Sequence, residues 1–403
     1  MNVLQINTVD CKGGAAKVAT ELQRQLHADG HGSYFLVGSR GDFKNPYTDS
    51  IPINRFSRSL NYRLHTNDTI FRTASIVSKH PWFTSADVVH FHNIHGGYFN
   101  LEAFPYLTHL KPSVWTLHDP WIVHEFGLTP EYNPIFKRIS SFFTTKKQRL
   151  IKQNNAILIS PSRWLSEKVL SCYPDADVRV IPNGIDTTIF HHSDKQACRK
   201  TLDLPLDKHL VLFVAYEGSK HPTKGWEYTE ALCRSSHIPD DVLFVSIGDR
   251  NNGNRLTQDH RVIHIPFIDN PNILAQYYSA CDTFLFPSLA DNLPLVALEA
   301  MSCGLPVISF DTGGMKEIID HNMNGYLVMY KNSDELLRTV QQVIAMPNDE
   351  RQNVSNNAIK KIQQHFTLKR MVQSYSDIYE EAIKKHAILN SINRSQRAFL
   401  HKK

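Results

Sequence analysis

In this 403-residue chain the residues that most clearly indicate a functional site are two carboxylates eight positions apart, Asp291 and Glu299. The segment from 287 to 314 reads PSLADNLPLVALEAMSCGLPVISFDTGG, and it predicts a strand end, a turn and a helix that stops at Gly304. Glu299 is the only charge in that helix, among apolar and small neighbours, so the helix should be buried. A buried carboxylate must be met by a polar group. That group is either a ligand or an internal ion-pair partner.

The turn before this helix predicts a place for an anion. We expect Asn292 to cap the helix and Pro294 to lie in its first turn. Asp291 and Glu299 then border one helix N-terminus, where backbone amides and the helix dipole favour an anion such as a diphosphate. Amides for phosphate and carboxylates for hydroxyls are the groups that a sugar diphosphate needs.

The acid-x7-acid spacing followed by Ala-Met-x-Cys-Gly-x-Pro-Val resembles the signature of the family 4 retaining glycosyltransferases, and the resemblance covers nearly the whole chain. Lys224-Gly225 resembles the phosphate-binding Lys-Gly of that family, and Gly13-Gly14 its N-terminal glycine loop near the donor phosphates. Residues 181–186 (IPNGID) are similar to the segment that ends its first domain.

Two histidine-containing segments, 90–96 (HFHNIHG) and 115–119 (WTLHD), are similar to a subgroup that builds bacterial exopolysaccharide and O-antigen, including colanic-acid transferases. There are also departures from the family pattern. Asp291 replaces a common Glu, Pro294 replaces a common Gly and removes one amide donor, and Gly218 stands where the family often has Arg. Lys220 would substitute for that Arg.

The resemblance implies a GT-B fold, in which two doubly wound, Rossmann-like α/β domains face each other across a cleft. It also implies a nucleoside-diphosphate-sugar co-substrate, retention at the anomeric carbon and no metal cofactor. Catalytic roles are expected for Asp291, which would hold the transferred sugar, for His118 and for Lys224. The acceptor side is expected at Asn93, His95 and Gly96. The donor-binding residues implied are Gly13, Gly14, Lys220, Lys224, Asn292, Leu293, Leu295, Val296 and Glu299, the last holding the ribose.

Short apolar runs separated by helical patterns predict the parallel sheets that would position these residues. In the first half we expect strands at 3–6, 34–37, 88–91, 114–117, 156–159 and 178–181, and in the second half at 210–215, 242–247, 262–265, 283–286 and 307–310. The predicted domains are 1–190 on the acceptor side and 191–367 on the donor side. A helix at about 368–387 is expected to pack back on the first domain, followed by a loose basic tail at 388–403.

Three histidines, His90, His92 and His95, raise zinc as an alternative, and two of them share one face of a strand. No fitting carboxylate or cysteine lies nearby in the sequence, so we predict no metal site. The net charge of +5 is mild and predicts no nucleic-acid partner. The six cysteines are widely spaced and indicate a reduced, cytoplasmic protein.

The segment 136–152 mixes basic with apolar residues, which predicts either peripheral contact with the inner face of an anionic membrane or a solvated helix face. No run is long enough to span a bilayer. We therefore predict a hexosyltransferase that moves a sugar from a nucleotide donor to a glycan hydroxyl, on an acceptor that can be lipid-linked, in surface polysaccharide synthesis. The alternatives are a sugar-nucleotide epimerase or hydrolase, which would act without an acceptor, and a non-catalytic binding protein.

Overall fold

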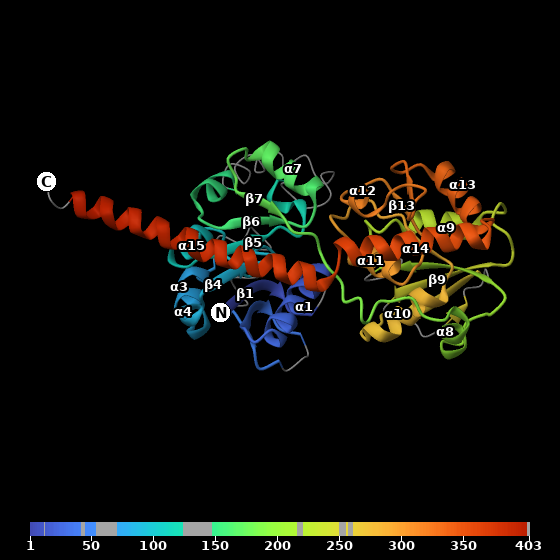
Figure 1. The fold of residues 1–403 in the computed structure, drawn as a ribbon, viewed down its shortest axis with the longest axis horizontal. Coiled ribbons are helices and arrows are strands. Elements are labelled where there is room, and N and C mark those ends of the chain that lie inside the picture. The colour runs from blue at the N-terminus through green and yellow to red at the C-terminus, as the bar shows by residue number, and fades with distance from the viewer. Residues whose placement is uncertain are drawn as a thin grey trace. The chain divides into compact units, whose positions relative to one another are not determined.

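The structure is a computed structural model, and it describes residues 1–11, 13–41, 45–53, 71–123, 147–215, 221–249, 255–256 and 261–400 (Figure 1). The chain forms two compact units. Unit 1 consists of Met1–Ile181 and Met371–Lys403, and unit 2 consists of Pro182–Arg370. The boundaries therefore fall at 181/182 and 370/371, where the sequence suggested 190/191 and 367/368.

Unit 1 contains a seven-stranded sheet in the order β3-β2-β1-β4-β5-β6-β7, and all its strands pair in parallel. The strands are β1 (Asn2–Val9), β2 (Gly32–Ser39), β3 (Thr48–Ser50), β4 (Val88–Phe91), β5 (Ser113–Thr116), β6 (Ile157–Ser160) and β7 (Val178–Val180). The helices are α1 (Gly14–Ala28), α3 (Thr73–Ser78), α4 (Pro81–Ser85), α5 (Ala103–Leu110), the 3₁₀ turn η1 (Pro120–Ile122), α7 (Arg163–Cys172) and α15 (Leu368–Leu400). Strand order reverses between β1 and β4, which is the place where doubly wound sheets bind ligands.

Unit 2 contains a second seven-stranded sheet in the order β10-β11-β9-β8-β12-β13-β14, parallel except for β10. Its strands are β8 (His209–Val214), β9 (Val242–Asp249), β10 (Arg255–Leu256), β11 (Val262–Pro266), β12 (Thr283–Phe286), β13 (Val307–Phe310) and β14 (Tyr326–Val328). Its helices are α8 (Lys195–Thr201), α9 (Trp226–Arg234), α10 (Pro271–Ala280), α11 (Leu295–Ser302), α12 (Met315–Ile318), α13 (Ser333–Ile344) and α14 (Asn348–His365). Strand order reverses here between β8 and β12.

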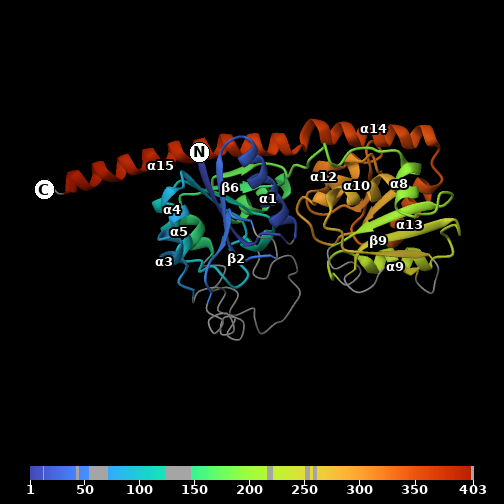
Figure 2. The ribbon, with the colours of Figure 1, turned by 90° about the horizontal axis from the view of Figure 1, so that it is seen from below.

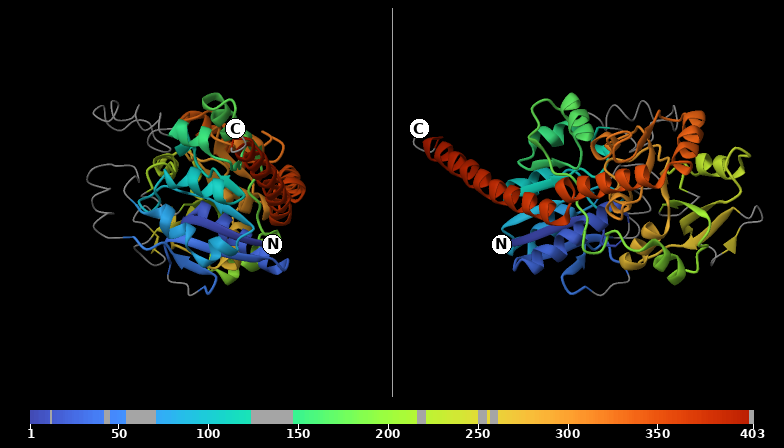
Figure 3. Two further views of the ribbon diagram at one scale, coloured as in Figure 1. Left: turned by 90° about the vertical axis from the view of Figure 1, so that its left-hand side faces the viewer. Right: turned by 45° about the vertical axis from the view of Figure 1, so that its right-hand side comes forward.

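Each sheet is covered by helices on both faces (Figure 2, Figure 3). Strands buried on both faces need apolar side chains throughout, which is why they appear in the sequence as short continuous apolar runs. The strands β4, β5, β6, β12 and β13 are buried at every position. The predicted α/β class with two doubly wound sheets is confirmed.

Helix α15 differs from the expectation at its C-terminal end. We expected a helix to about residue 387 and a loose tail after it, but the helix runs from Leu368 to Leu400. No Pro or Gly occurs between 388 and 400, so nothing in the sequence ends the helix there. Earlier in the helix, the buried Tyr375 and Tyr379 bond to Thr116 and His90 of the unit 1 sheet.

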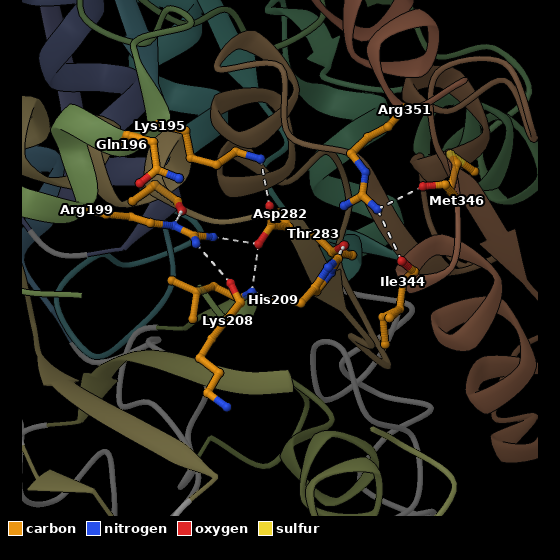
Figure 4. Close-up of polar contacts among 12 residues, drawn as sticks. Lys195, Gln196, Arg199, Lys208, His209, Asp282, Thr283, Ile344, Met346 and Arg351 are labelled. Atoms are coloured by element: carbon orange, nitrogen blue, oxygen red, sulfur yellow. Dashed lines mark hydrogen bonds and ion pairs between the residues drawn. The ribbon is translucent and has the colours of Figure 1, made fainter. Parts of the chain in front are cut away.

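The amino end of β12 in unit 2 is held by a buried ionic cluster around Asp282 (Figure 4). The Asp282 carboxylate accepts from Arg199 at 2.7 Å, from Lys195 at 2.6 Å and from the backbone amide of Leu210 at 2.8 Å. His209 lies beside it and bonds Thr283. This cluster ties β8, α8 and β12 together at the edge opposite the carboxyl ends of the strands.

Candidate active site

The candidate site of unit 2 is built at the carboxyl end of β12, where residues 287–294 lead into α11. The N-cap of α11 is Pro294 (φ −72°, ψ 126°), and no side chain caps the helix. The expectation that Asn292 caps it and that Pro294 lies inside its first turn is therefore wrong. Asn292 lies three positions before the first helical residue, whereas an N-cap directly precedes it. Its carbonyl instead accepts from the amide of Gly314 at 2.7 Å.

The first backbone amides of a helix have no hydrogen-bond partner within that helix. In α11 these amides include those of Leu295 and Val296. Leu293 is buried, and its carbonyl accepts from the side-chain amide of Asn183 at 2.8 Å. Asn183 is the second residue of unit 2, so this bond fixes the turn before α11 to the start of the unit. Leu293 thus lies in the turn before α11, and Leu295 and Val296 are the first two residues of the helix.

Lys224 and Asp291, 67 positions apart, form a direct ion pair. Lys224 Nζ lies 2.8 Å from both carboxylate oxygens of Asp291. Ser288 Oγ is 2.5 Å from Asp291 Oδ2 and 3.1 Å from the carbonyl of Thr223. Both charged side chains remain partly exposed, at 21% for Lys224 and 17% for Asp291. Asp291 thereby orients Lys224 at the edge of the site while solvent, or a ligand, can still reach it.

Two glycines with positive φ allow this close approach of three loops. Gly225 has φ 70°, and a Cβ there would lie 1.9 Å from the carbonyl oxygen of Pro287. Gly313 has φ 58°, and a Cβ there would lie 1.7 Å from the carbonyl oxygen of Asp291. Because any side chain would collide with backbone, the Lys-Gly pair and the 312–314 loop each require glycine at these places.

Glu299 lies one turn into α11 and is almost fully buried, with 1% exposure. Its Oε2 accepts from the hydroxyl of Tyr278 at 3.1 Å. Burial, together with the negative charge of Glu299, raises the pKa of Tyr278 well above its usual value, so the tyrosine stays a neutral donor. The charge of Glu299 is therefore met in part by a hydroxyl from α10, which the sequence did not suggest.

In unit 1, Gly13 and Gly14 form the turn between β1 and α1. Gly13 has φ 86° and is the N-cap of the 15-residue helix α1, which begins at Gly14. Among the described residues, no atom other than those of chain neighbours or of the helix's own backbone lies within 4 Å of a Cβ built on either glycine. This turn presents backbone without side chains at a helix N-terminus, the arrangement that favours phosphate.

The predicted acceptor loop follows β4 and is fastened to the end of β1. The amide of Asn93 donates to Asn7 Oδ1 at 3.1 Å. The hydroxyl of Thr8 is within hydrogen-bond distance of the carbonyls of Asn93 (3.2 Å) and His95 (2.8 Å). Gly96 follows with φ 99°. Asn93, His95 and Gly96 thus lie together at the carboxyl edge of the sheet.

His118 and Asp119 follow β5, next to that loop. His118 Nε2 lies 2.9 Å from His92 Nδ1. Asp119 Oδ2 lies 3.3 Å from His95 Nε2, and its Oδ1 accepts from the amide of Trp121, whose ring stacks on His95 at 4.8 Å. Burial by itself would raise the pKa of Asp119, but the hydrogen bond and charge of His95 hold it below its usual value. Asp119 therefore remains ionised beside the His95 ring.

The buried histidines of unit 1 are neutral at neutral pH. Burial, followed by neighbouring histidines, lowers the pKa of His92 well below its usual value. Burial lowers the pKa of His118 to about 4, although Asp119 acts in the opposite direction. His90 bonds hydroxyls at both ring nitrogens, Tyr379 at Nδ1 and Thr116 at Nε2, each at 2.7 Å. Within the described ranges, no group of three or more His, Cys, Asp or Glu side chains is arranged to hold a metal ion.

Several sequence-predicted residues lie outside the described residues, namely Lys220, Gly218 and most of the basic segment 136–152. Four residues around the site were missed by the sequence reasoning: Ser288, Tyr278, Gln5 and Asn183. Gln5 had a signal, because it is a polar residue inside the apolar run 3–6 of a strand buried on both faces. Asn183 lies in the family-like segment 181–186, but no role was predicted for it. Ser288 and Tyr278 carry no sequence pattern that separates them from ordinary polar residues.

Two family models match consecutive parts of the chain. Residues 12–189 match the model described as Glycosyltransferase Family 4, and residues 195–361 match the model described as Glycosyl transferases group 1. A putative colanic acid biosynthesis glycosyl transferase, WcaC of Escherichia coli K12, is 26% identical over 392 residues, covering 85% of this chain and 90% of that protein.

An uncharacterized glycosyltransferase of Methanocaldococcus jannaschii is 28% identical over 239 residues, which is 56% of this chain and 60% of that relative. The match therefore spans less than two thirds of that protein. Among solved structures, Anabaena HepE in complex with UDP superimposes with a TM-score of 0.70 at 20% identity, covering 94% of this chain and 100% of that chain. This likeness shows a shared fold.

Proposed function

The chain belongs to the family 4 glycosyltransferases with the GT-B fold, and we propose that it transfers a sugar, with retention, from a nucleoside-diphosphate-sugar to a glycan hydroxyl in surface polysaccharide synthesis. The observation that carries this proposal is the pairing of Lys224 with Asp291 beside the N-terminus of α11, with Glu299 one turn further along. WcaC supports the polysaccharide part, since its name assigns it to colanic acid biosynthesis. HepE, named as a complex with UDP, supports the nucleotide part.

In this proposal unit 2 binds the donor. An ammonium has three N–H groups, and the two contacts to Asp291 leave Lys224 able to direct its charge at a phosphate oxygen as well. The amides of Leu295 and Val296 add donors and the positive end of the helix dipole. Asn292 and Leu293 shape the turn, Glu299 accepts from ribose hydroxyls, and Asp291 accepts from a hydroxyl of the transferred sugar. Lys220 contributes to the phosphate site from outside the described residues.

The leaving diphosphate gains negative charge as the glycosidic bond breaks. Lys224 and the α11 amides are fixed before the reaction, so they stabilise that charge without reorganising. The departing phosphate oxygen takes the proton of the acceptor hydroxyl, which attacks from the same face, so the chain needs no dedicated base. This account requires no metal ion.

For unit 1 we propose that Gly13 and Gly14 lie near the donor phosphates and that His118 contacts the donor sugar. Asn93, His95 and Gly96 receive the acceptor glycan. A lipid-linked acceptor and peripheral contact with an anionic membrane are part of the proposal and rest on the basic segment 136–152. None of the helices in the described residues has the length and apolar composition required to cross a bilayer.

A panel of UDP-, GDP-, ADP- and dTDP-sugars tests the donor part, with thermal shift for binding and release of nucleoside diphosphate for slow hydrolysis. We expect one donor class to stabilise the protein and to leak nucleoside diphosphate, as transferases do in the absence of acceptor. Efficient acceptor-independent conversion would instead favour an epimerase or hydrolase. Tight binding without turnover would favour a binding protein. If no donor in the panel binds, the assignment of the phosphate site to Lys224 and the α11 amides is wrong.

A further inference from the structure

The last part of α15 packs less closely on unit 1 than the part before it. Earlier in the helix, Met371, Tyr375, Tyr379 and Ala382 are buried. Among residues 383–392, whose exposure the structure describes, none is buried. Figure 1 and Figure 2 show the last turns of the helix extending beyond the strands and the other helices of unit 1. We call residues 383–400 the α15 extension, and at a rise of about 1.5 Å per residue it is about 27 Å long.

An exposed apolar stripe, made of Ile388 and Ile392, lies on this extension. Lys384, Ile388 and Ile392 follow one another at four-residue spacing, so they share one face of the helix. Lys384 is 75% exposed, Ile388 60% and Ile392 47%. Isoleucines exposed on consecutive turns leave apolar surface in water, which is unfavourable. An isolated helix of this length is also only marginally stable in water, so a partner that covers the stripe would stabilise the extension.

The charge of the same segment limits what that partner can be. After Glu381 the chain contains no Asp or Glu. It contains six basic residues there, namely Lys384, Lys385, Arg394, Arg397, Lys402 and Lys403. Because the whole chain has a net charge of +5, residues 1–381 together have a net charge of −1. Lys384 pairs with Glu380 at 3.6 Å and Lys385 with Asp177 at 3.0 Å, but from residue 386 onward the only formally charged side chains are basic. The partner should therefore be anionic.

We propose that the α15 extension is a docking helix for an anionic lipid bilayer. The helix lies along the bilayer surface, and Ile388 and Ile392 enter the boundary between headgroups and acyl chains. The net positive charge of the segment is attracted to the anionic headgroups. This inference does not rest on the proposed sugar transfer, and it concerns a segment that is distant in sequence from the basic residues at 136–152.

Two other partners fit only one of these features. A second copy of the chain would cover the isoleucines, but two extensions side by side would bring like charges together. A nucleic acid would neutralise the positive charge, but its phosphate backbone would leave the isoleucines in water. An anionic bilayer supplies an apolar layer and negative charge at the same surface, so it accounts for both.

Vesicle flotation of the full-length protein tests the proposal, with vesicles of phosphatidylcholine alone and of phosphatidylcholine mixed with phosphatidylglycerol. We expect binding to the mixed vesicles, much weaker binding to the neutral ones, and a fall in binding as salt is added, because salt screens exposed charges. Equal binding to both kinds of vesicle, or no binding to the mixed ones, would overturn the proposal. The assay needs no sugar donor, so its failure is separate from a failure of the transferase proposal.

Substitutions on the stripe locate the contact. Ile388→Asn combined with Ile392→Asn should weaken binding to the mixed vesicles at least about tenfold, because both changes remove apolar surface that the bilayer buries. Since both isoleucines are exposed, the melting temperature without vesicles should stay unchanged within a few degrees. Ile273→Asn, at a 41% exposed position of α10, is the matched control and should bind as the unmodified protein does. Arg394→Ala combined with Arg397→Ala should weaken binding and reduce its dependence on salt.

Two further results would each overturn the lipid assignment of this helix. Full binding by the double isoleucine variant would place the membrane contact elsewhere in the chain, at a segment such as 136–152. Sedimentation velocity without vesicles gives the second result. A dimer that the double isoleucine variant converts to a monomer would show that a second copy of the chain covers the stripe.

Discussion

Glu299 occupies a position that a carboxylate takes only at a cost. It is 1% exposed and lies among the apolar residues of α11, a setting in which a carboxylate needs polar partners. Tyr278 offsets part of that cost with a hydrogen bond at 3.1 Å to Oε2. A carboxylate kept at such a position, one turn from a helix N-terminus, suits a residue that binds ligand hydroxyls.

Substituting Glu299 should separate this role from a structural one. Glu299→Gln keeps the size of the side chain but loses the charge that strengthens hydrogen bonds to hydroxyls. We expect kcat/KM for the donor to fall about 100-fold, roughly 3 kcal/mol, with the melting temperature unchanged within a few degrees. Glu230→Gln, on the exposed surface of α9, is the matched control and should leave kcat/KM unchanged. Full activity of Glu299→Gln would refute the ribose assignment.

At the scale of elements, the carboxyl ends and the amino ends of the unit 2 strands have different roles. The carboxyl edge carries the Lys224–Asp291 pair and α11, while the amino edge carries the Asp282 cluster (Figure 4). Arg199 is itself buried and donates to three backbone carbonyls and to Asp282, so the cluster is satisfied internally. It links α8 to β8 and β12, which flank the reversal of strand order.

The Asp282 cluster should give unit 2 a pH-dependent stability. Burial lowers the pKa of His209 to about 4, with Asp282 acting in the opposite direction, against about 6.5 in the unfolded chain. The unfolded state therefore binds more protons between these values, so the contribution is complete above about pH 6.5 and is lost as the pH falls towards 4. The difference corresponds to roughly 3 kcal/mol.

Denaturant unfolding at pH 7.0 and at pH 4.5 measures this contribution. The free energy of unfolding of unit 2 should drop over this range, and the drop should be clearly smaller in His209→Gln. His365→Gln, at an exposed position at the end of α14, should keep the full drop. An equal pH dependence in His209→Gln and the unmodified protein would show that His209 does not titrate as its burial requires.

The elements also show where sequence reasoning works. Fully buried strands such as β4, β5, β12 and β13 were predicted, because a strand that is buried on both faces has an apolar run in its sequence. The edge strands β3, β10 and β14 were missed, since two or three residues are too few to form a pattern. The Lys224–Asp291 contact was beyond reach too, because it depends on how two loops fold back, not on spacing.

At the scale of the whole molecule, the two units differ in continuity. Unit 2 is one uninterrupted segment, Pro182–Arg370, whereas unit 1 needs Met371–Lys403 to be complete. The reason lies in α15, whose Tyr375 and Tyr379 are buried against the sheet and satisfy Thr116 and His90. Without α15, buried polar groups of β4 and β5 lose their partners, which costs about 1–3 kcal/mol for each group.

We therefore expect a fragment of residues 182–370 to fold alone, with a cooperative thermal transition, and to be stabilised by the same donor as the full chain. A fragment of residues 1–181 should unfold at a lower temperature than unit 1 does in the full chain, and a peptide of residues 368–400 added in trans should raise that temperature.

Lys224→Ala in the 182–370 fragment is the control for the donor shift. Donor stabilisation that appears only in the full chain would mean that unit 2 does not hold the donor by itself, and an unaided 1–181 fragment of full stability would remove α15 from the core of unit 1.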